Sequence, residues 1–583
     1  KTLCSLLLLI IIGNVNALQQ PRQQAVVVGS GPVGVATSLI LATNHNYDVT
    51  LLESSPASSS QTKYDPTKAF LYNVNGRGQR LTKMFPEMHQ RMVERSVISK
   101  GFGGTKLTIV PADPGEPIPE QKANVPAAAD KEDDGNDNKS MPSGEKAGNV
   151  GFWIPRHEMV KLMVEEIEEH NKRGLGGTIT LCTGQECVSV VPRSTNEDGE
   201  SVTVVVTTKD ASSSSSSQEI STNEYNANLV IGADGMNSKV RQCLHNAPPG
   251  TWSSNCLKSS KFQPKKFTSP ASFLRIKVLQ LPPQFEIPDA DGKPPLKTFS
   301  QDIYAIRSVN TGPRTFLSLG LLPMKDNTAV RPTNIITRPD HGIWKITNGK
   351  SMREYFQQAF PRFNFQEGGL ISNEEWDRFA KAEGTRFPPC QYSPGLAVWD
   401  TSGSSGVALV GDSIHAFSPD IGQGVNAGLM DVVCLDRALS GLADVESGKE
   451  VDSDTATEKT KKQTTTLEAN LERYQKQHAP EIAALIRLAR FGAPYQYKQP
   501  HRADRALRLV WTANVAMRLL LSKVSFGVIQ PPCIILSQNE DLTFREVMRR
   551  ADRTTALLKT IVLAGLTLWA KRRFGLALFR ALP

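Results

Sequence analysis

The sequence of 583 residues has few cysteines and lacks the spacings with which cysteines and histidines hold structural metals. The eight cysteines are scattered, and only Cys182 and Cys187 lie close together, with no further ligand pair near them. A small disulfide-stapled scaffold is excluded, since a chain of this length buries a sizeable apolar core. We expect mostly free core thiols and no metal centre.

Long apolar runs are scarce as well. A membrane-spanning helix needs about 20 consecutive apolar residues, whereas the apolar residues 561–570 are preceded by Lys559 and followed at once by Lys571, Arg572 and Arg573. We therefore expect an anchor or interfacial helix that binds anionic headgroups. The alternative is a last helix packed on the body of the protein.

Most of the chain carries as many negative as positive charges. Residues 501–583 hold 14 Lys and Arg against 5 Asp and Glu, an excess of nine that equals the net charge of the whole chain, +9. These arginines are interleaved with Leu, Val and Ile and form no polar basic patch, which argues against a nucleic-acid partner. The charge favours a membrane surface as the partner of this region.

The first residues, KTLCSLLLLIIIGNVNALQQ, combine a lysine, an apolar core of about ten residues and a small-residue site near Ala17. This is the pattern of a secretory signal, so we treat residues 1–17 as a signal-like segment outside the fold. We expect a membrane-associated protein of the endoplasmic reticulum or an organelle, with mitochondrial and plastid membranes left open.

Three polar stretches interrupt the chain and are interpreted as solvated loops: residues 111–149, residues 208–218 with six consecutive serines, and residues 441–467. The insertion 111–149 and an inserted second domain divide a dinucleotide-binding domain into three parts. The predicted division is 24–110, 150–245 and 401–440 for that domain, 246–400 for a substrate domain, and 468–583 for a helical C-terminal region.

Hydrophobic periodicity predicts the fold class. Nearly continuous apolar runs that end in Gly or an acid are typical of buried parallel strands, and residues 272–281 and 314–323 read as strands of a second sheet. Residues 152–171 have helical spacing. We expect an α/β protein in which a Rossmann-like domain is interleaved with a second β-sheet domain and followed by helices. The predicted parallel strands are 25–29, 47–53, 227–234 and 406–412.

A glycine-rich turn follows the first predicted strand. Gly29, Gly31 and Gly34 lie between strand and helix, and Glu53 ends the next strand 19 residues after Gly34. Glycines permit a tight turn and a close approach of a pyrophosphate to helix N–H groups, and the acid accepts hydrogen bonds from ribose hydroxyls. The motif predicts a bound dinucleotide without separating FAD from NAD.

Two later motifs also place an acid and glycines at strand ends. Asp234 and Gly235 follow one buried strand, and GDSIHAFSPDIGQGVNAGLMD (411–431) follows another. Asp412 is placed to accept hydrogen bonds from the hydroxyls of a flavin's ribityl chain. Pro419 fixes a rigid turn, and the glycines after it leave bare backbone at a helix N-terminus, where the dipole favours negative charge.

The stretch 411–431 resembles the GD motif of the single-component FAD-dependent monooxygenases of the para-hydroxybenzoate hydroxylase type. The resemblance extends from Gln24 to about Arg490. It implies FAD as the cofactor, NADPH as co-substrate and dioxygen as oxidant, with Pro419, Gly422 and Asn426 near the flavin ring and His415 in a structural role. The flavin carries the chemistry, so no catalytic side chain is assigned. The cofactor-binding residues implied are Gly29, Gly31, Gly34, Glu53, Arg156, Asp234, Gly235, Gly411, Asp412, Gly422, Gln423, Gly424, Val425 and Asn426.

No second dinucleotide fold is found, which fits enzymes that NADPH visits transiently. Within the group the chain is most similar to the kynurenine 3-monooxygenases, through NGRGQRL (75–81) and its basic, apolar C-terminal extension. Where that family binds a carboxylate, residues 101–117 offer only Lys106 and no Tyr. Three alternatives stay open: an epoxidase or hydroxylase of an apolar isoprenoid-like substrate, a flavin-dependent reductase, and an FAD-bound interaction protein without turnover.

Overall fold

The computed structural model describes residues 22–56, 62–66, 70–100, 106–119, 150–194, 202–210, 222–272, 274–312, 315–366, 369–442, 465–495 and 502–580. The predicted signal-like segment 1–17 lies outside the described residues. So do residues 120–149, 211–221 and 443–464, which make up most of the three predicted loops.

The central sheet takes its six strands from segments far apart in the sequence. The four strands predicted to be parallel are neighbours in it, which confirms them: Val27 on one strand pairs with Leu51 on one side and Ile231 on the other, and Ile231 pairs with Ala408. Only the edge strand β21 runs antiparallel to its neighbour. The order is β21 (Ala397–Trp399), β22 (Gly406–Leu409), β11 (Leu229–Gly232), β1 (Gln24–Val28), β2 (Asp48–Glu53) and β7 (Ile179–Thr183).

Helices bury the apolar strands of this sheet. Helix α2 (Pro32–His45) packs against α5 (Arg156–Arg173) and α9 (Gly424–Leu439), and α10 (Leu467–Phe491) packs on α9 in turn. Strand residues such as Val27 and Ile231 are fully buried, because parallel strands are covered on both faces. The carboxyl ends of the strands therefore meet at one edge, where the predicted motifs lie.

The second sheet carries its own core. Helices α7 (Gly349–Ala359) and α8 (Asn373–Lys381) cover one face of it, and the Phe356 and Trp376 rings pack edge-to-face with centroids 5.1 Å apart. The strand order is β19 (Thr385–Arg386), β13 (Arg275–Leu281), β18 (Arg331–Thr337), β17 (Ser318–Leu321), β16 (Ile303–Arg307) and β5 (Leu107–Val110).

Two predicted boundaries are wrong. Strand β5 pairs with β16 and so belongs to the second sheet, whereas β21 belongs to the first. Residues 111–119, the start of the predicted polar insertion, are packed on the second domain: Ile118 is buried, and the Arg362 guanidinium donates to the carbonyl oxygens of Asp113 and Glu116. Pairing between strands that are far apart in the sequence determines to which sheet β5 and β21 belong, and the amino-acid composition does not reveal such pairing.

Smaller elements connect the two sheets. The described residues also form three sheets of three strands each and one two-stranded sheet, joined by short helices and turns. They are β3 (Leu71–Val74), α3 (Gly76–Thr82), α4 (Pro86–Arg95), β4 (Val97–Lys100), β6 (Val150–Pro155), β8 (Gln185–Ser194), β9 (Val202–Asp210), β10 (Thr222–Ala227), α6 (Lys239–Asn246), η4 (Ser259–Phe262), β12 (Lys265–Phe267), β14 (Glu286–Ile287), β15 (Leu296–Lys297), η5 (Gly342–Lys345), β20 (Cys390–Tyr392), η6 (Gly411–Ser413), β23 (His415–Ala416) and η7 (Pro419–Ile421).

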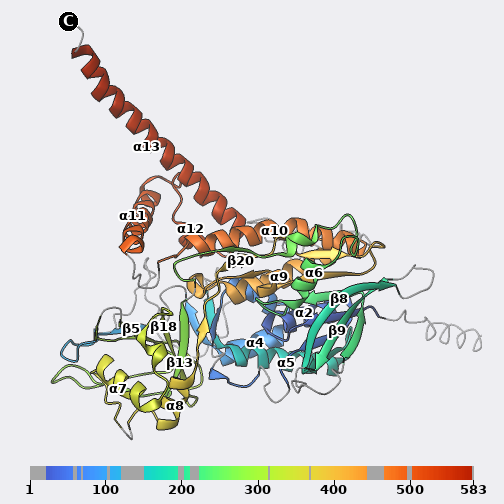
Figure 1. Cartoon of the computed structure of the whole chain (residues 1–583), viewed down its shortest axis with the longest axis horizontal. Coiled ribbons are helices and arrows are strands. Elements are labelled where there is room, and N and C mark those ends of the chain that lie inside the picture. The colour runs from blue at the N-terminus through green and yellow to red at the C-terminus, as the bar shows by residue number, and fades with distance from the viewer. Residues whose placement is uncertain are drawn as a thin grey trace, which may run out of the picture.

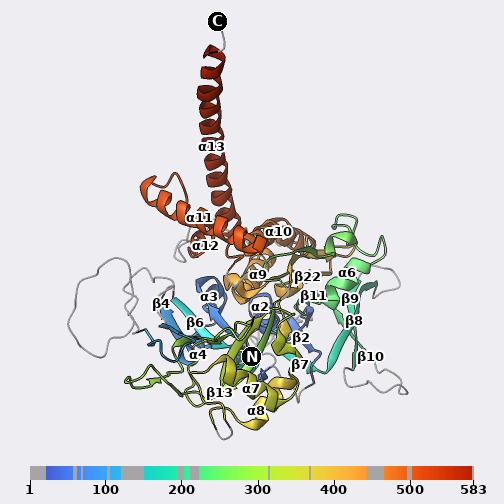
Figure 2. The ribbon, with the colours of Figure 1, turned by 60° about the vertical axis from the view of Figure 1, so that its left-hand side comes forward.

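The C-terminal region is helical, as predicted. Helices α11 (Arg502–Val524), α12 (Cys533–Leu536) and α13 (Phe544–Arg580) follow α10, and α13 extends away from the body in both views (Figures 1 and 2). Its distal part leaves large apolar side chains in solvent, among them Val562 and Leu566. Within the described residues, no helix combines the length and the apolar character that a membrane crossing requires.

Candidate functional site

The first glycine turn packs directly on the second motif. Gly29 has φ +104°, and a Cβ placed on it would lie 2.5 Å from the Ala233 carbonyl oxygen and 2.9 Å from the Asp234 Cα. A Cβ on Gly34 would collide with the Gly29 carbonyl oxygen at 1.8 Å. These two glycines are therefore required by the fold, because backbone passes where a side chain would be.

Glu53 lies beside this turn, as its spacing predicts. Its Oε2 accepts hydrogen bonds from the Ser30 backbone N–H at 3.1 Å and the Ser30 hydroxyl at 2.7 Å. Burial acts to raise the pKa of Glu53, but the hydrogen bonds from Ser55 and Ser30 outweigh it, so the pKa lies below its usual value. The residue is an anionic acceptor at the edge where a ribose would bind.

Asp234 caps the helix that follows its strand. Its Oδ2 accepts from the backbone N–H groups of Lys239 at 2.6 Å and Val240 at 3.2 Å. Its Oδ1 is buried and has no hydrogen-bond partner among the described residues. Burial raises the pKa of this carboxyl, against the lowering effect of those hydrogen bonds. An unsatisfied carboxylate oxygen at this edge fits a ligand that brings a donor.

The third motif is joined to both of the others. The Arg241 guanidinium donates to the Ser413 carbonyl oxygen at 2.5 Å, and the Ser413 hydroxyl donates to the Gly232 carbonyl oxygen at 2.6 Å. A Cβ on Gly411, which has φ +63°, would lie 3.1 Å from the Val33 side chain at the start of α2. The structure thus brings the three predicted turns together at one edge of the sheet.

The glycines of these motifs fall into two groups. Gly29, Gly34 and Gly411, together with Gly428 of α9, are packed against other parts of the chain. A Cβ added to any glycine of the second group would meet no atom within 4 Å, so the backbone there is open to a ligand, as a close approach of phosphate or flavin requires. The open glycines are Gly31, Gly235, Gly422 and Gly424.

A cluster of Tyr72, Arg156 and Asp412 lies at the same edge. The Tyr72 hydroxyl is hydrogen-bonded to Arg156 and feels the charge of Asp412. Burial raises the pKa of Tyr72, Arg156 opposes this rise and Asp412 adds to it. The Asp412 side chain is reached by solvent, yet surrounding protein raises the pKa of its carboxyl, with Asp431 adding to the rise and His415 opposing it.

Behind Asp412 is a buried network centred on Asp431. One carboxylate oxygen accepts from the Gly411 N–H at 2.7 Å and contacts His415 Nε2 at 2.8 Å, and the other contacts His478 Nε2 at 2.6 Å. The Tyr474 ring stacks on His478, and its hydroxyl donates to the Leu409 carbonyl oxygen at 2.9 Å. His415 is fully buried and faces this network, in keeping with the structural role predicted for it.

The remaining predicted residues lie in the turn before α9 and in the first turn of that helix. Asn426 is buried, and its amide binds the backbone of Asn73, Asn75 and Gly422, so its side chain braces the turn against β3. Pro419 is exposed. Val425 is half-buried, and Gln423 is buried with an Oε1 that no described residue binds.

Sequence reasoning missed Ser30, Tyr72, Asp431 and His478. Ser30 lies inside the glycine motif and Asp431 ends the stretch 411–431, so both could have been identified from the sequence motifs. Tyr72 and His478 reach the site through long-range packing alone, and nothing in their neighbourhood in the sequence marks them.

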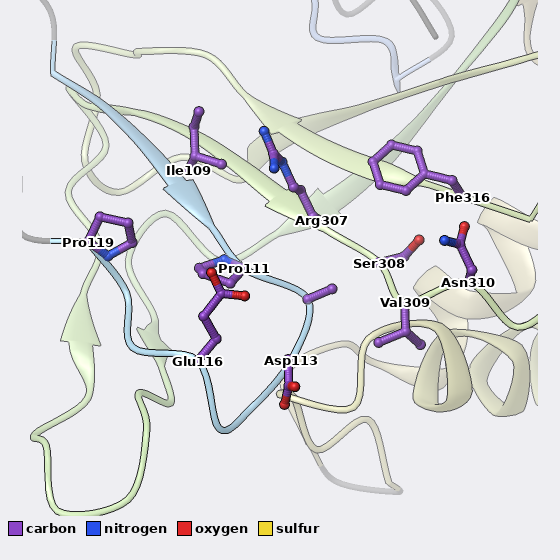
Figure 3. Close-up of a pocket in the computed structure, with 11 residues that line it drawn as sticks. Ile109, Pro111, Asp113, Glu116, Pro119, Arg307, Ser308, Val309, Asn310 and Phe316 are labelled. Carbon is purple, nitrogen blue, oxygen red and sulfur yellow. The ribbon is translucent and has the colours of Figure 1, made fainter. Parts of the chain in front are cut away.

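A separate hollow of ≈ 620 Å³ lies on the second domain (Figure 3). Ile109, Arg307 and Phe316 border it together with Asp113 and Glu116. None of its lining residues belongs to the three turns, so it is distinct from the predicted cofactor edge.

Comparison with known proteins bears on the third turn. Residues 398–470 match the model of a family described as the FAD binding domain. The segment holds Gly411, Asp412 and helix α9. The match shows that the third turn and the helix after it are similar to that domain, within a chain of mixed α/β architecture.

The relatives are distant. The Ubiquinone biosynthesis monooxygenase COQ6, mitochondrial, of Schizosaccharomyces pombe is 26% identical over 238 residues, which is 37% of this chain and 42% of that protein. Among solved structures, 2-methyl-3-hydroxypyridine-5-carboxylic acid oxygenase is 15% identical, with TM-score 0.46 and coverage of 84% of this chain and 93% of that one. PqsL of Pseudomonas aeruginosa, titled a probable FAD-dependent monooxygenase, is 16% identical, with TM-score 0.42 and coverage of 80% and 94%.

Proposed function

We propose that this chain is an FAD-dependent monooxygenase that uses NADPH and dioxygen to insert one oxygen atom into an organic substrate. The observation that carries the proposal is the convergence of three turns, at Gly29, Asp234 and Gly411, with open backbone at Gly31, Gly235, Gly422 and Gly424. The FAD-binding match on the third turn and the similarity over 238 residues to a monooxygenase of ubiquinone biosynthesis support it.

Bound FAD would supply hydride acceptance and dioxygen activation, which no amino-acid side chain provides. Different residues of the chain would bind different parts of FAD. The open backbone at Gly31 and the N-terminus of α2 suit the pyrophosphate, and Glu53 suits the ribose. Asp412 suits the ribityl hydroxyls, and the N-terminus of α9 at Gly424 stabilises negative charge beside it.

The substrate is either kynurenine, by 3-hydroxylation, or a neutral apolar molecule of isoprenoid type. The first needs a cation for the amino-acid carboxylate. Arg77, in the Arg-Gly helix start, is buried, and its guanidinium donates to the carbonyl oxygens of Ser537, Asn539 and Leu542. Lys106 is exposed. These arrangements favour the neutral substrate.

The chemistry is tested on purified yellow protein under ¹⁸O₂ with NADPH and a mixed pool of aromatic and isoprenoid compounds. Substrate-triggered NADPH oxidation with a product that gains one ¹⁸O atom supports the monooxygenase. NADPH oxidation without oxygen in the product supports the reductase, and bound FAD without any turnover supports the interaction protein. Protein that purifies without FAD and does not bind FAD when it is added overturns all three of these proposed functions.

We also propose association with an endoplasmic reticulum or organelle membrane through α11 and α13. Exposed apolar side chains such as Leu509, Leu520 and Leu566 support it, together with the excess of positive charge in residues 501–583. The signal-like start supports delivery to such a membrane. Subcellular fractionation of the tagged full-length chain tests the location.

A further inference from the structure

A row of five residues crosses the second sheet on the face opposite α7 and α8. Val278 pairs with Asn334, Asn334 with Gly320, Gly320 with Ala305 and Ala305 with Ile109, so the five lie side by side on β13, β18, β17, β16 and β5. We call them the cross-strand row.

The row faces away from the core of its own domain. Its neighbours along the strands, such as Leu279, Ile335 and Leu321, point the other way and are fully buried beneath the helices. Val278, Asn334, Gly320 and Ala305 are half-buried, and Ile109 is 40% exposed. Among the described residues this apolar sheet face is only partly covered, and such a surface is suited to an apolar molecule.

Asn334 is the one polar side chain in the row. Its Oδ1 is shielded from solvent yet has no hydrogen-bond partner among the described residues. The neighbouring Gly320 adds no side chain above it: a Cβ there would stand 3.9 Å from the Asn334 Cβ, in ordinary contact. A shielded acceptor left unpaired costs free energy, which a ligand that donates a hydrogen bond would recover.

Two connections place the row next to the cofactor edge. At one side, Gln280 of β13 contacts the Tyr64 hydroxyl at 3.5 Å, and the Tyr64 ring packs on His157, the neighbour of Arg156. At the other side, Ile276 packs with Phe387 in a small cluster. Three residues on from Phe387, Cys390 packs against Ile421 of the turn before α9. Both connections start on β13, on either side of Val278, so they place this end of the row near the cofactor edge.

No charged side chain belongs to the row. The cation on the adjacent row of the same face is Arg307, which lines the separate hollow of Figure 3 with Asp113 and Glu116. The buried Arg77 is held by backbone carbonyl oxygens. An anionic substrate would lose its hydration over this row without gaining a counter-charge.

We propose that the cross-strand row is the substrate surface and that the substrate is a neutral, mostly apolar molecule whose hydroxyl or N–H donates to Asn334 Oδ1. The inference rests on the proposed function, because it assigns the substrate class of the same site. Asn334 is then a specificity-determining residue, since it rejects analogues that leave its oxygen unpaired.

The test uses the full-length, FAD-loaded protein and the change in flavin absorbance on titration. Three probes are compared: geraniol, geranyl methyl ether, which keeps the apolar body and lacks the donor, and L-kynurenine, which carries a carboxylate. We expect geraniol to bind about tenfold tighter than its methyl ether, the ratio that one hydrogen bond of ordinary strength gives. L-kynurenine is expected to bind more weakly than either.

Variants separate the hydrogen bond from the surrounding fold. Asn334→Val is expected to bring the ratio between geraniol and its methyl ether close to one by weakening geraniol. Gly320→Ala, which fits without strain, is expected to weaken both probes alike by narrowing the space. The control Asn223→Ala removes an exposed amide from β10 in another sheet and is expected to leave both affinities unchanged.

Three results overturn the inference: an unchanged ratio in Asn334→Val, tighter binding of L-kynurenine than of geraniol, or no flavin response to geraniol. Each is measured on protein that is already yellow, so the proposed FAD function stands in all three. Failure of the wild-type chain to hold FAD is a different result, and it removes the proposed function itself.

Discussion

His415 Nε2 lies 2.8 Å from Asp431 Oδ2, and both side chains are almost completely buried. The same carboxylate oxygen accepts the Gly411 N–H, so the pair fixes the backbone from which Asp412 reaches the cofactor edge. Asp431 is thereby a positioning residue for the third turn.

Asp431→Asn is expected to destabilise the protein by about 3 kcal/mol, because breaking a buried pair leaves its partners unsatisfied. The amide keeps one acceptor oxygen but loses the negative charge, and its NH₂ group faces a group that the carboxylate had bound: His478 on one side, or His415 and the Gly411 N–H on the other. Thermal unfolding of the apoprotein measures the change. Asp436→Asn is a matched control, since Asp436 lies one turn and a half along α9 and binds the exposed Asn44 and the half-buried His45. Equal melting temperatures for wild type and Asp431→Asn would contradict the assignment.

The His415 and Asp431 pair predicts a stability maximum between two pH limits. Burial alone would lower the pKa of His415, but Asp431 raises it above its ordinary value, so its contribution is present at acidic pH and lost as the pH rises through the raised pKa. Burial would raise the pKa of Asp431, but His415 and His478 lower it to about 2, so its contribution is lost as the pH falls toward that value.

Urea unfolding of the apoprotein across this pH range measures both limits. In His415→Gln, the free energy of unfolding is expected to fall less steeply as the pH rises into the alkaline range. The fall at acidic pH, to which other carboxylates contribute, is expected to remain. An alkaline limb of unchanged slope in this variant would show that His415 does not cause it.

Asp412→Ala is expected to weaken FAD binding about ten- to a hundredfold, since a charge-assisted hydrogen bond is worth about 1.5–3 kcal/mol. The fold is expected to persist, because the side chain is exposed. Fluorescence titration of apoprotein with FAD gives the dissociation constant. Asp291→Ala, on an exposed loop of the second domain, is the control. Protein that stays fully yellow after the Asp412 change would remove the ribityl contact.

Gly31→Ala and Gly424→Ala are expected to fold normally and to lose FAD affinity, because each added methyl group enters space that is open in the protein alone. Neither glycine has a positive φ. Gly342→Ala, where the space is also open but lies in the second domain, is expected to keep wild-type affinity. Gly34→Ala is expected to misfold, since its Cβ would meet backbone at 1.8 Å.

The full-length protein is expected to float with vesicles that contain anionic lipid and to bind neutral vesicles more weakly, because cations near the surface each add about 1 kcal/mol. Replacing Leu563, Leu566 and Trp569, which are all exposed, by serine is expected to reduce flotation without changing FAD content. Flotation that is the same for the triple variant would place the membrane contact elsewhere.

The sequence predicts the central sheet well because its parallel strands are locally apolar and end in turns with a distinctive glycine pattern. The position of β5 was not predictable, since Leu107–Val110 is a short apolar segment that either sheet could accept. Its pairing with β16, some 196 residues away in the chain, determines the sheet to which it belongs. His478 and Tyr72 were missed for the same reason, as their neighbours in space are remote in the chain. The positions of Glu53 and Asp234 were accessible because a strand end fixes where the next side chain lies.

The scattered origin of the central sheet has a consequence for biosynthesis. Strand β22, at Gly406–Leu409, is the last of the six to leave the ribosome, and until it arrives β11 presents an unpaired edge. More than two thirds of the polypeptide must be translated before the nucleotide cradle is closed. The apolar edge of β11 is therefore exposed in the nascent chain until β22 has been made, and an exposed strand edge of this kind favours aggregation.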